Sequence, residues 1–129
     1  MPSLRLVVHE GRHAVCQVDP DRGVPAWVLG RPFFAVVATA GELSAIVPQE
    51  RVPEGVKAER GWRLLSLAGP FPFEATGILA SVLQPLAAAG VGILALSTFD
   101  TDVVLVKEER LGDAVAALRE AGHTVDAGP

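Results

Sequence analysis

The chain has 129 residues, half of them apolar, and a formal net charge of −4. This apolar share can bury one core or two small fused ones. The acidic balance and the lack of a basic run argue against nucleic acid or an anionic membrane as a partner. A single cysteine excludes an internal disulfide, and the first residues lack the pattern of a signal peptide, so we expect a cytoplasmic protein.

The first half of the chain is predicted to be rich in strands. Four apolar runs next to turn-forming residues have strand character: residues 4–8, 14–18, 33–39 and 43–47. The first two flank a turn at Gly11, and the last two form a hairpin. Residues 25–29 predict one or two helical turns that end at Gly30. Residues 48–61 are rich in proline, glycine and charge, which indicates a connector with one turn of helix.

The second half carries two helical patterns between strand-like runs. Apolar side chains recur at the spacing of one helix face from Ile78 to Leu86 and from Leu111 to Leu118. Gly122 suits the end of the second helix. Strands are predicted at residues 62–67, 92–96, 103–106 and 123–125. Residues 62–126 therefore have the order β-α-β-β-α-β, which is the split βαβ or ferredoxin-like unit of an α+β protein.

Residues 77–96 carry no charge and are long enough to cross a bilayer. Pro85 interrupts the helix, however, and glycines at 90 and 92 end it, so the run predicts an amphipathic helix and a buried strand instead of a membrane segment. Because proline has no amide N–H, we expect Pro85 to remove the hydrogen bond to the carbonyl of Ser81 and to kink the axis.

Two polar features of the second half point to a ligand site. Residues 97–102, Ser-Thr-Phe-Asp-Thr-Asp, place hydroxyls and carboxylates between two apolar strands, and such a cluster belongs at a turn that meets water or a ligand. The loop 69–77 leads into a helix N-terminus, where unpaired N–H groups favour an anion such as an amino acid's carboxylate. Gly77 either lets a ligand approach the backbone or relieves crowding against a strand.

Five segments of the second half carry a further pattern: residues 61–65, 76–80, 86–93, 97–102 and 117–123. Together they resemble the ACT domains of a small bacterial family, related to the regulatory region of aspartate kinase and to the CASTOR arginine sensors. Residues 41–47 resemble that family's acidic pair followed by Leu-Ser, although Gly41 replaces the first acid. The resemblance implies a reduced, strand-rich ACT-like module in residues 1–60 and a full ACT domain in residues 61–129.

The resemblance also implies that a free amino acid binds between the two modules. Its α-carboxylate would face the backbone at residues 75–77, because the helix start favours an anion. Its cationic group would face Asp102, because the sensors place an acid there. The predicted ligand-binding residues are Ser44, Ile46, Glu74, Ala75, Thr76, Gly77, Ile78, Thr98, Phe99 and Asp102.

Some of these residues have ordinary structural interpretations as well. Asp102 could only accept hydrogen bonds from turn amides, and Ser44 and Ile46 could only pack on a strand. Glu74 is either a first-turn residue that interacts with the helix dipole or a second carboxylate for an ammonium group. Asp100 is expected to be a solvated turn residue.

The remaining reactive residue types predict no catalytic, metal or cofactor site. Cys16 lies in an apolar strand and has the character of a buried hydrophobe, while His9, His13 and His123 are too scattered for a metal. An acylphosphatase-like hydrolase on the same topology would need a cation in the loop 69–77, which has no Arg or Lys. A ligand-free ACT scaffold that binds a partner protein is the other alternative.

The sequence therefore predicts an allosteric regulatory protein that senses an amino acid and is not an enzyme. We also expect it to self-associate as a two-fold homodimer, because the Ala-rich helix 78–89 can bury part of its face against a copy. A regulated enzyme or another partner protein would respond to the bound ligand.

Overall fold

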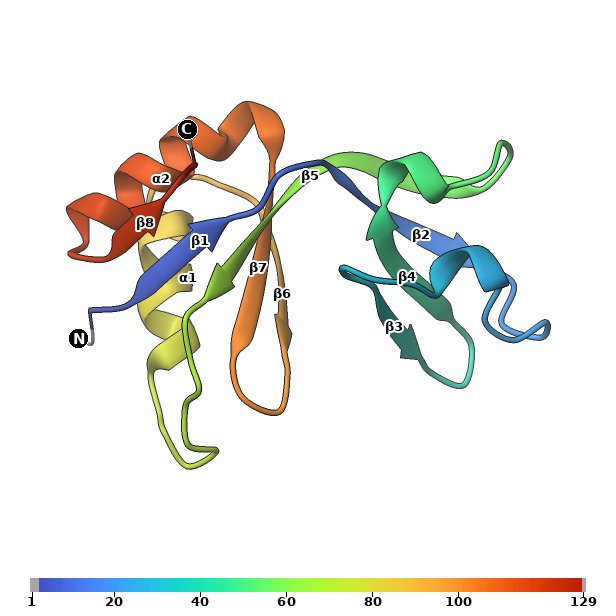
Figure 1. Ribbon diagram of the computed structural model, residues 1–129, viewed down its shortest axis with the longest axis horizontal. Helices are drawn as coiled ribbons and strands as arrows, with labels where there is room; N and C mark the ends of the chain where they lie inside the picture. The colour runs from blue at the N-terminus through green and yellow to red at the C-terminus, as the bar shows by residue number, and fades with distance from the viewer. Residues whose placement is uncertain (1–2, 129) are drawn as a thin grey trace. The chain divides into compact units, whose positions relative to one another are not determined.

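The computed structural model describes residues 3–128, which form eight strands, two α-helices and three short 3-10 turns (Figure 1). These residues divide into two compact units. The helical unit consists of residues 3–10 and 63–128, and the strand unit consists of residues 11–62. The long strand β5 (Lys57–Leu67) contributes its first part to the strand unit and its second part to the helical unit.

The sheet of the helical unit has the strand order β6-β7-β5-β1-β8. Its other strands are β1 (Arg5–Val8), β6 (Ile93–Ser97), β7 (Asp102–Lys107) and β8 (Thr124–Asp126). β1 is antiparallel to β5 and parallel to β8, so that Leu6 lies opposite Leu67 on one side and Val125 on the other. β1 thus enters between the first and the last strand of the β-α-β-β-α-β order, where a simple split βαβ unit would pair these two directly.

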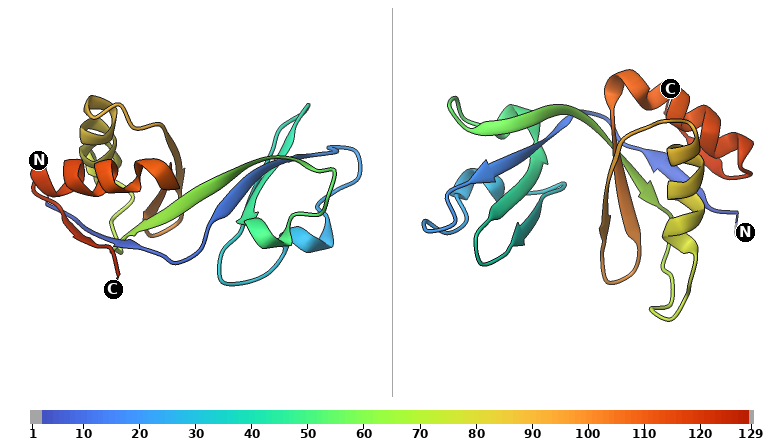
Figure 2. Two further views of the ribbon diagram at one scale, coloured as in Figure 1. Left: turned by 90° about the horizontal axis from the view of Figure 1, so that it is seen from above. Right: turned by 180° about the vertical axis from the view of Figure 1, so that it is seen from behind.

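Two helices, α1 (Ile78–Ala88) and α2 (Leu111–Glu120), cover one face of this sheet (Figure 2). Alternate residues of the strands point to that face, and they form one core with the buried stripes of the helices. Arg110 precedes α2 and donates through its guanidinium to the carbonyls of Ala89 and Gly90 at the end of α1. The fully buried members of this core are Leu6, Leu65, Val82, Leu86, Val104, Val106, Ala114 and Leu118.

The strand unit is an antiparallel sheet with the order β3-β4-β2-β5. It contains β2 (His13–Val18), β3 (Ala35–Ala38), β4 (Leu43–Pro48) and the 3-10 turns η1 (Ala26–Val28) and η2 (Gln49–Arg51). Its buried core is made of Ala14, Cys16, Val28, Ala45 and Val47. Arg51 donates to the carbonyls of Gly30 and Arg31, which fastens the loop after η1 to η2.

The structure confirms the α+β class and the β-α-β-β-α-β order of residues 62–126, as well as the hairpin of β3 and β4. The predicted connector over residues 48–61 is wrong from Lys57 onward, because β5 begins there. This part of β5 is an edge strand of the strand unit, and an edge strand tolerates the charged residues that hide it in the sequence. None of the helices in residues 3–128 is long and apolar enough to cross a membrane.

A division of the chain between residues 60 and 61 would group β1 with β2, β3 and β4, but β1 lies in the helical unit. β1 has both of its strand partners, β5 and β8, in the helical unit. Periodicity along the chain reveals that residues 4–8 form a strand, but not with which distant strand they pair. The boundary between residues 60 and 61 stays a prediction about domain organisation.

Candidate ligand-binding site

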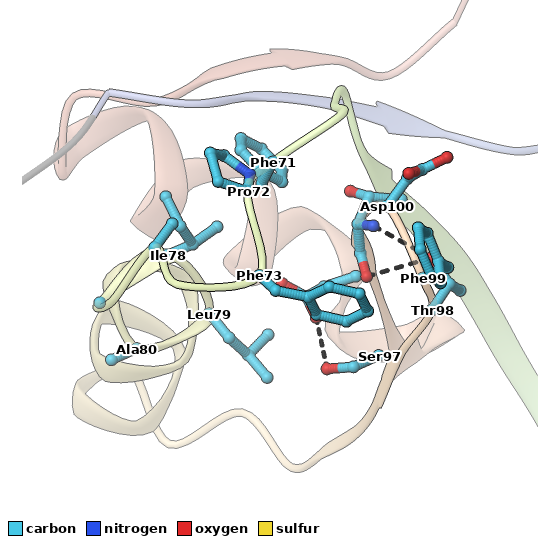
Figure 3. A pocket seen from close by; sticks show the side chains of 14 residues that line it. Phe71, Pro72, Phe73, Ile78, Leu79, Ala80, Ser97, Thr98, Phe99 and Asp100 are labelled. Carbon is cyan, nitrogen blue, oxygen red and sulfur yellow. Dashed lines mark hydrogen bonds between the residues drawn. The ribbon is translucent and has the colours of Figure 1, made fainter.

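A cavity of about 290 Å³ lies in the helical unit, between the start of α1, the loop before it and the turn from β6 to β7 (Figure 3). Its lining joins two segments of the chain that the sheet brings together. The lining residues are Phe71, Pro72, Phe73, Ala75, Gly77, Ile78, Leu79, Ala80, Ser97, Thr98, Phe99, Asp100, Thr101 and Asp102.

The start of α1 supplies hydrogen-bond donors to this cavity. Gly77 is the N-cap with φ of 78°, a left-handed conformation that favours glycine, and no side chain caps the helix. The first intrahelical bond runs from the N–H of Ser81 to the carbonyl of Gly77 at 3.0 Å. The amides of Ile78, Leu79 and Ala80 therefore have no acceptor within the helix, and all three residues line the cavity. This end of the cavity favours an anion.

The turn from β6 to β7 supplies the carboxylates. Its backbone is fixed by the N–H of Thr98, which donates to the carbonyl of Thr101 at 2.8 Å, and by the N–H of Thr101, which donates to Thr98 Oγ1 at 3.0 Å. Ser97 Oγ donates to Asp102 Oδ1 at 2.5 Å, which orients the half-buried Asp102 carboxylate. Asp100 is exposed.

The loop before α1 is tied to this turn. The N–H of Phe71 donates to the carbonyl of Asp100 at 2.7 Å, and Thr101 Oγ1 donates to the carbonyl of Leu67 at 2.9 Å. Gly69 makes the approach feasible, because a Cβ there would lie 3.1 Å from the Asp100 carbonyl oxygen and 3.1 Å from Thr101 Cβ. Hydrogen bonds between the loop and the turn therefore hold the two walls of the cavity at a defined separation.

Two phenylalanines form the rim of the cavity. The rings of Phe73 and Phe99 meet edge to face, with centroids 4.7 Å apart and an interplanar angle of 76°. Both side chains are largely exposed, 71% for Phe73 and 78% for Phe99, and Figure 3 shows them side by side above Ser97. Exposed aromatic rings in contact can cover the apolar stem of a ligand or lie over a cationic group.

The charges of the cavity are unequally distributed. Its lining within the described residues includes the acidic residues Asp100 and Asp102 but no Lys, Arg or His. The opposite end is formed by the N-terminus of α1, where the helix dipole is positive. A ligand with a carboxylate at one end and a cation at the other would find a complementary partner at both ends.

Six of the predicted binding residues meet in this cavity: Ala75, Gly77, Ile78, Thr98, Phe99 and Asp102. Glu74 and Thr76 are exposed in the adjoining loop and do not line it. Ser44 and Ile46 lie in β4 of the strand unit, where they are half-buried and buried, respectively. Asp100 is exposed, as expected for a solvated turn residue, but it also lines the cavity. The roles of all these residues toward a ligand stay predictions.

Sequence reasoning missed a larger group of lining residues, namely Phe71, Pro72, Phe73, Leu79, Ala80, Ser97 and Thr101. Some signals were present. Ser97 and Thr101 belong to the polar run already singled out, and the first turn of a helix presents three successive residues next to its cap. The alternation Phe71-Pro72-Phe73 in a loop was the signal for an apolar wall.

The other reactive residues have structural surroundings. Burial raises the pKa of the Cys16 thiol above its ordinary value, and the positive charge of Arg60 opposes this shift. His9 Nε2 lies 2.7 Å from Ser66 Oγ, and His13 meets the ring of Phe33 edge to face. Residues 3–128 contain no group of three or more His, Cys, Asp or Glu side chains that could hold a metal ion.

Comparison with known families agrees with this architecture. A family model described as ACT domain matches residues 57–120, and a second model, which describes an N-terminal domain, matches residues 11–55. The chain belongs to the ACT domain family. The family predicted from the sequence is thereby confirmed, and the residues matched to the ACT domain run from β5 to the end of α2.

Solved structures extend this likeness over the whole chain. Protein Atu0741 from Agobacterium tumefaciens is 33% identical, with a TM-score of 0.94 over 100% of this chain and 96% of that one. The regulatory subunit of aspartate kinase from Thermus thermophilus shares the fold, with a TM-score of 0.60 at 14% identity over 85% of this chain and 91% of that one.

A human protein called cytosolic arginine sensor for mTORC1 subunit 1 is 30% identical over 95 residues. The match covers 67% of this chain and 29% of the human protein, so the chain spans under a third of that relative's length.

Proposed function

We propose that this protein is a regulatory module that binds a free amino acid in the cavity of its ACT domain and has no catalytic activity. The observation that carries the proposal is the pairing of two opposite electrostatic features across one cavity. The unpaired amides of Ile78, Leu79 and Ala80 lie at one end, and Asp100 and Asp102 line the other, where Ser97 orients the Asp102 carboxylate. Membership in a family whose relatives include a protein named for sensing arginine supports the same function.

The hydrogen bonds already made near the start of α1 favour one orientation of the proposed ligand. The N–H of Ala75 already donates to the carbonyl of Pro72 at 3.0 Å, which makes it a poor donor for a ligand. The proposed α-carboxylate therefore binds the amides at the start of α1, from Ile78 to Ala80. The cationic group binds the Asp102 carboxylate, which Ser97 already orients, and Thr98 and Phe99 contact the stem between them.

Arginine is the first ligand to test. A cavity with two carboxylates and no cation in its lining favours a side chain that ends in a positive charge. A guanidinium can donate two parallel hydrogen bonds to a carboxylate, and it can lie over an aromatic ring such as Phe99. The human relative named as an arginine sensor gives the same priority to this amino acid.

Calorimetry with arginine, lysine and neutral amino acids tests the proposal. Asp102→Ala is expected to weaken arginine binding by about 2–5 kcal/mol, which is about 30-fold or more, because a seated cation loses its partner. Glu109→Ala is the matched control. It removes the same charge from an exposed position outside the lining, and it is expected to cost less than about 1 kcal/mol.

Ser97→Ala separates the contribution of the Asp102 charge from the contribution of its fixed orientation. This variant keeps the carboxylate but removes the hydroxyl that orients it, so its loss of affinity should lie between those of Glu109→Ala and Asp102→Ala. Equal, small losses for Asp102→Ala and Glu109→Ala would remove Asp102 from the site. If no amino acid binds the wild-type protein, a ligand-free scaffold becomes the better description.

Further parts of the proposal concern partners. Ser44 and Ile46 stay predicted contributors to ligand binding, and Ser44→Ala would lower the affinity for arginine if they contribute. Self-association as a two-fold dimer, a cytoplasmic location and a regulated partner protein also belong to the proposal. Light scattering tests the dimer, and a monomer mass at high micromolar concentration, with and without arginine, would contradict it.

A further inference from the structure

Helix α1 contains a proline in its last two turns and continues past it to Ala88. Pro85 has no amide N–H, so the carbonyl of Ser81, four residues earlier, has no helical donor. Ser81 is only 1% exposed. A buried carbonyl without a donor destabilises the folded state, so a donor from another segment would stabilise the helix at this point.

His123, which lies between α2 and β8, supplies that donor. Its Nε2 lies 2.8 Å from the carbonyl oxygen of Ser81, and the N–H of Leu4 donates to its Nδ1 at 3.0 Å. Because Nδ1 accepts a hydrogen bond, the proton of the neutral ring is on Nε2, where it points to Ser81. The ring is 5% exposed, and both of its nitrogens are used. Leu4 directly precedes β1, so the ring also joins β1 to α1.

Ser81 passes this connection on to the candidate site. Its N–H donates to the carbonyl of Gly77 at 3.0 Å, and its Oγ donates to the carbonyl of Ile78 at 2.7 Å. Gly77 and Ile78 line the cavity and begin the helix turn whose amides have no acceptor within the helix. These hydrogen bonds run from the buried imidazole of His123 through Ser81 to Gly77 and Ile78, at the end of the cavity where we propose that the anion binds. His123 itself does not line the cavity.

We propose that His123 replaces the amide donor that Pro85 removes, and that it acts through Ser81 as a positioning residue for the first turn of α1. The second half of this statement rests on the proposed function, because it concerns the turn that would bind the ligand's carboxylate. The first half concerns hydrogen bonds within the protein itself and can be tested without any ligand.

A double-mutant cycle tests the exchange of donors. Pro85→Ala restores an amide that can donate to Ser81, so the loss of His123 should matter less in that background. We expect His123→Phe to lower the urea midpoint of the wild-type protein more than that of Pro85→Ala, with a coupling of at least about twofold in the unfolding equilibrium constant. Additive effects would overturn the exchange of donors.

His123→Gln is the second variant, in case His123→Phe does not fold. The glutamine amide provides both a donor and an acceptor, so it should retain more of the stability than phenylalanine. Nitrogen-15 spectra of the imidazole give an independent signature, because they distinguish the Nε2–H tautomer from the Nδ1–H tautomer. We expect the Nε2–H tautomer, and an Nδ1–H tautomer would contradict the assignment.

Arginine binding then tests the positioning role. We expect His123→Gln to lower the affinity for arginine under conditions in which the variant is fully folded, and Pro85→Ala to restore part of that affinity when the two are combined. If the wild-type protein binds arginine and the variant binds it equally well, the positioning role is wrong although the proposed function stands. If arginine does not bind, the cycle and the tautomer still decide the exchange of donors.

Discussion

The buried cores of the two units differ in residue composition and in secondary structure. The helical unit packs two amphipathic helices on a sheet, and leucines from both layers fill its core. The strand unit has no α-helix among its described residues, and its buried core consists of alanine, valine and cysteine. A helix in the core brings with it a helix N-terminus, which is a source of unpaired amides. The candidate site therefore lies in the unit that has the helices.

Among the variants considered for the two units, substitutions in the buried cores should have the largest effects on the free energy of unfolding. Leu118→Ala removes a fully buried leucine that α2 contributes to the helical unit, and it is expected to lower the free energy of unfolding by about 2–5 kcal/mol. Val47→Ala removes a smaller buried side chain from the strand unit, and it is expected to cost about 2 kcal/mol. Urea unfolding measures both. A larger loss for Val47→Ala would reverse the comparison.

Two glycines of the helical unit form the next test. A Cβ would meet nothing within 4 Å at Gly77 or at Gly112, but only Gly77 has a positive φ. Gly77→Ala should therefore destabilise by about 1–2 kcal/mol through backbone strain alone. Gly112→Ala lies within α2 and should stabilise by about 0.5–1 kcal/mol. Thermal unfolding of the two variants would show opposite shifts, and shifts of the same sign would contradict the assignment of Gly77 as the helix cap.

Each unit also uses one arginine to hold two carbonyls. Arg110 binds those of Gly90 and Ala89 at 3.1 and 3.2 Å, and Arg51 binds those of Gly30 and Arg31. Arg110→Ala and Arg51→Ala are each expected to cost about 1 kcal/mol, because these are single hydrogen-bonding groups near the surface. Chemical denaturation checks the pair. A loss above about 3 kcal/mol for either variant would indicate a larger structural role.

The smallest expected effect concerns Cys16 in the strand unit. Burial raises the pKa of its thiol above 9.0, so the folded state holds the proton more tightly than the unfolded state. The stability from this group is complete below the unfolded pKa, and it is lost as the pH rises through the folded pKa. Compared with Cys16→Ala, the wild-type protein should therefore lose slightly more stability above pH 9.0.

A disulfide reagent should react slowly with Cys16 until the protein unfolds, and fast labelling of the native protein would be inconsistent with this burial.

Much of the helical unit could be predicted from the sequence because its signals are local. The two helical periodicities and the polar turn depend on residues that are neighbours in the chain. The sequence also predicts that Pro85 leaves the Ser81 carbonyl without its helical donor, because the two residues lie four positions apart in the same helix. That His123 would meet this carbonyl could not be predicted, because the contact joins residues 42 positions apart.

The misses share one physical cause, which is pairing between distant segments. The place of β1 between β5 and β8 depends on a register that no periodicity encodes. The start of β5 was hidden because charged residues occupy an edge strand. In the site, the polar turn and the helix start were found separately, but the aromatic pair of Phe73 and Phe99 required both segments to be placed in space.

Arginine titration followed by amide chemical shifts tests the central claim most directly, because it reports both units at once. We predict that the largest changes occur at Ile78, Leu79 and Ala80 and in the turn at residues 98–102, with saturation at a single affinity. The cavity of the strand unit beside Trp27, whose lining includes Arg22 and Lys57, serves as the internal comparison. Changes confined to that cavity, or the absence of any saturable change, would contradict the claim that the ACT domain of this chain binds an amino acid at the start of α1.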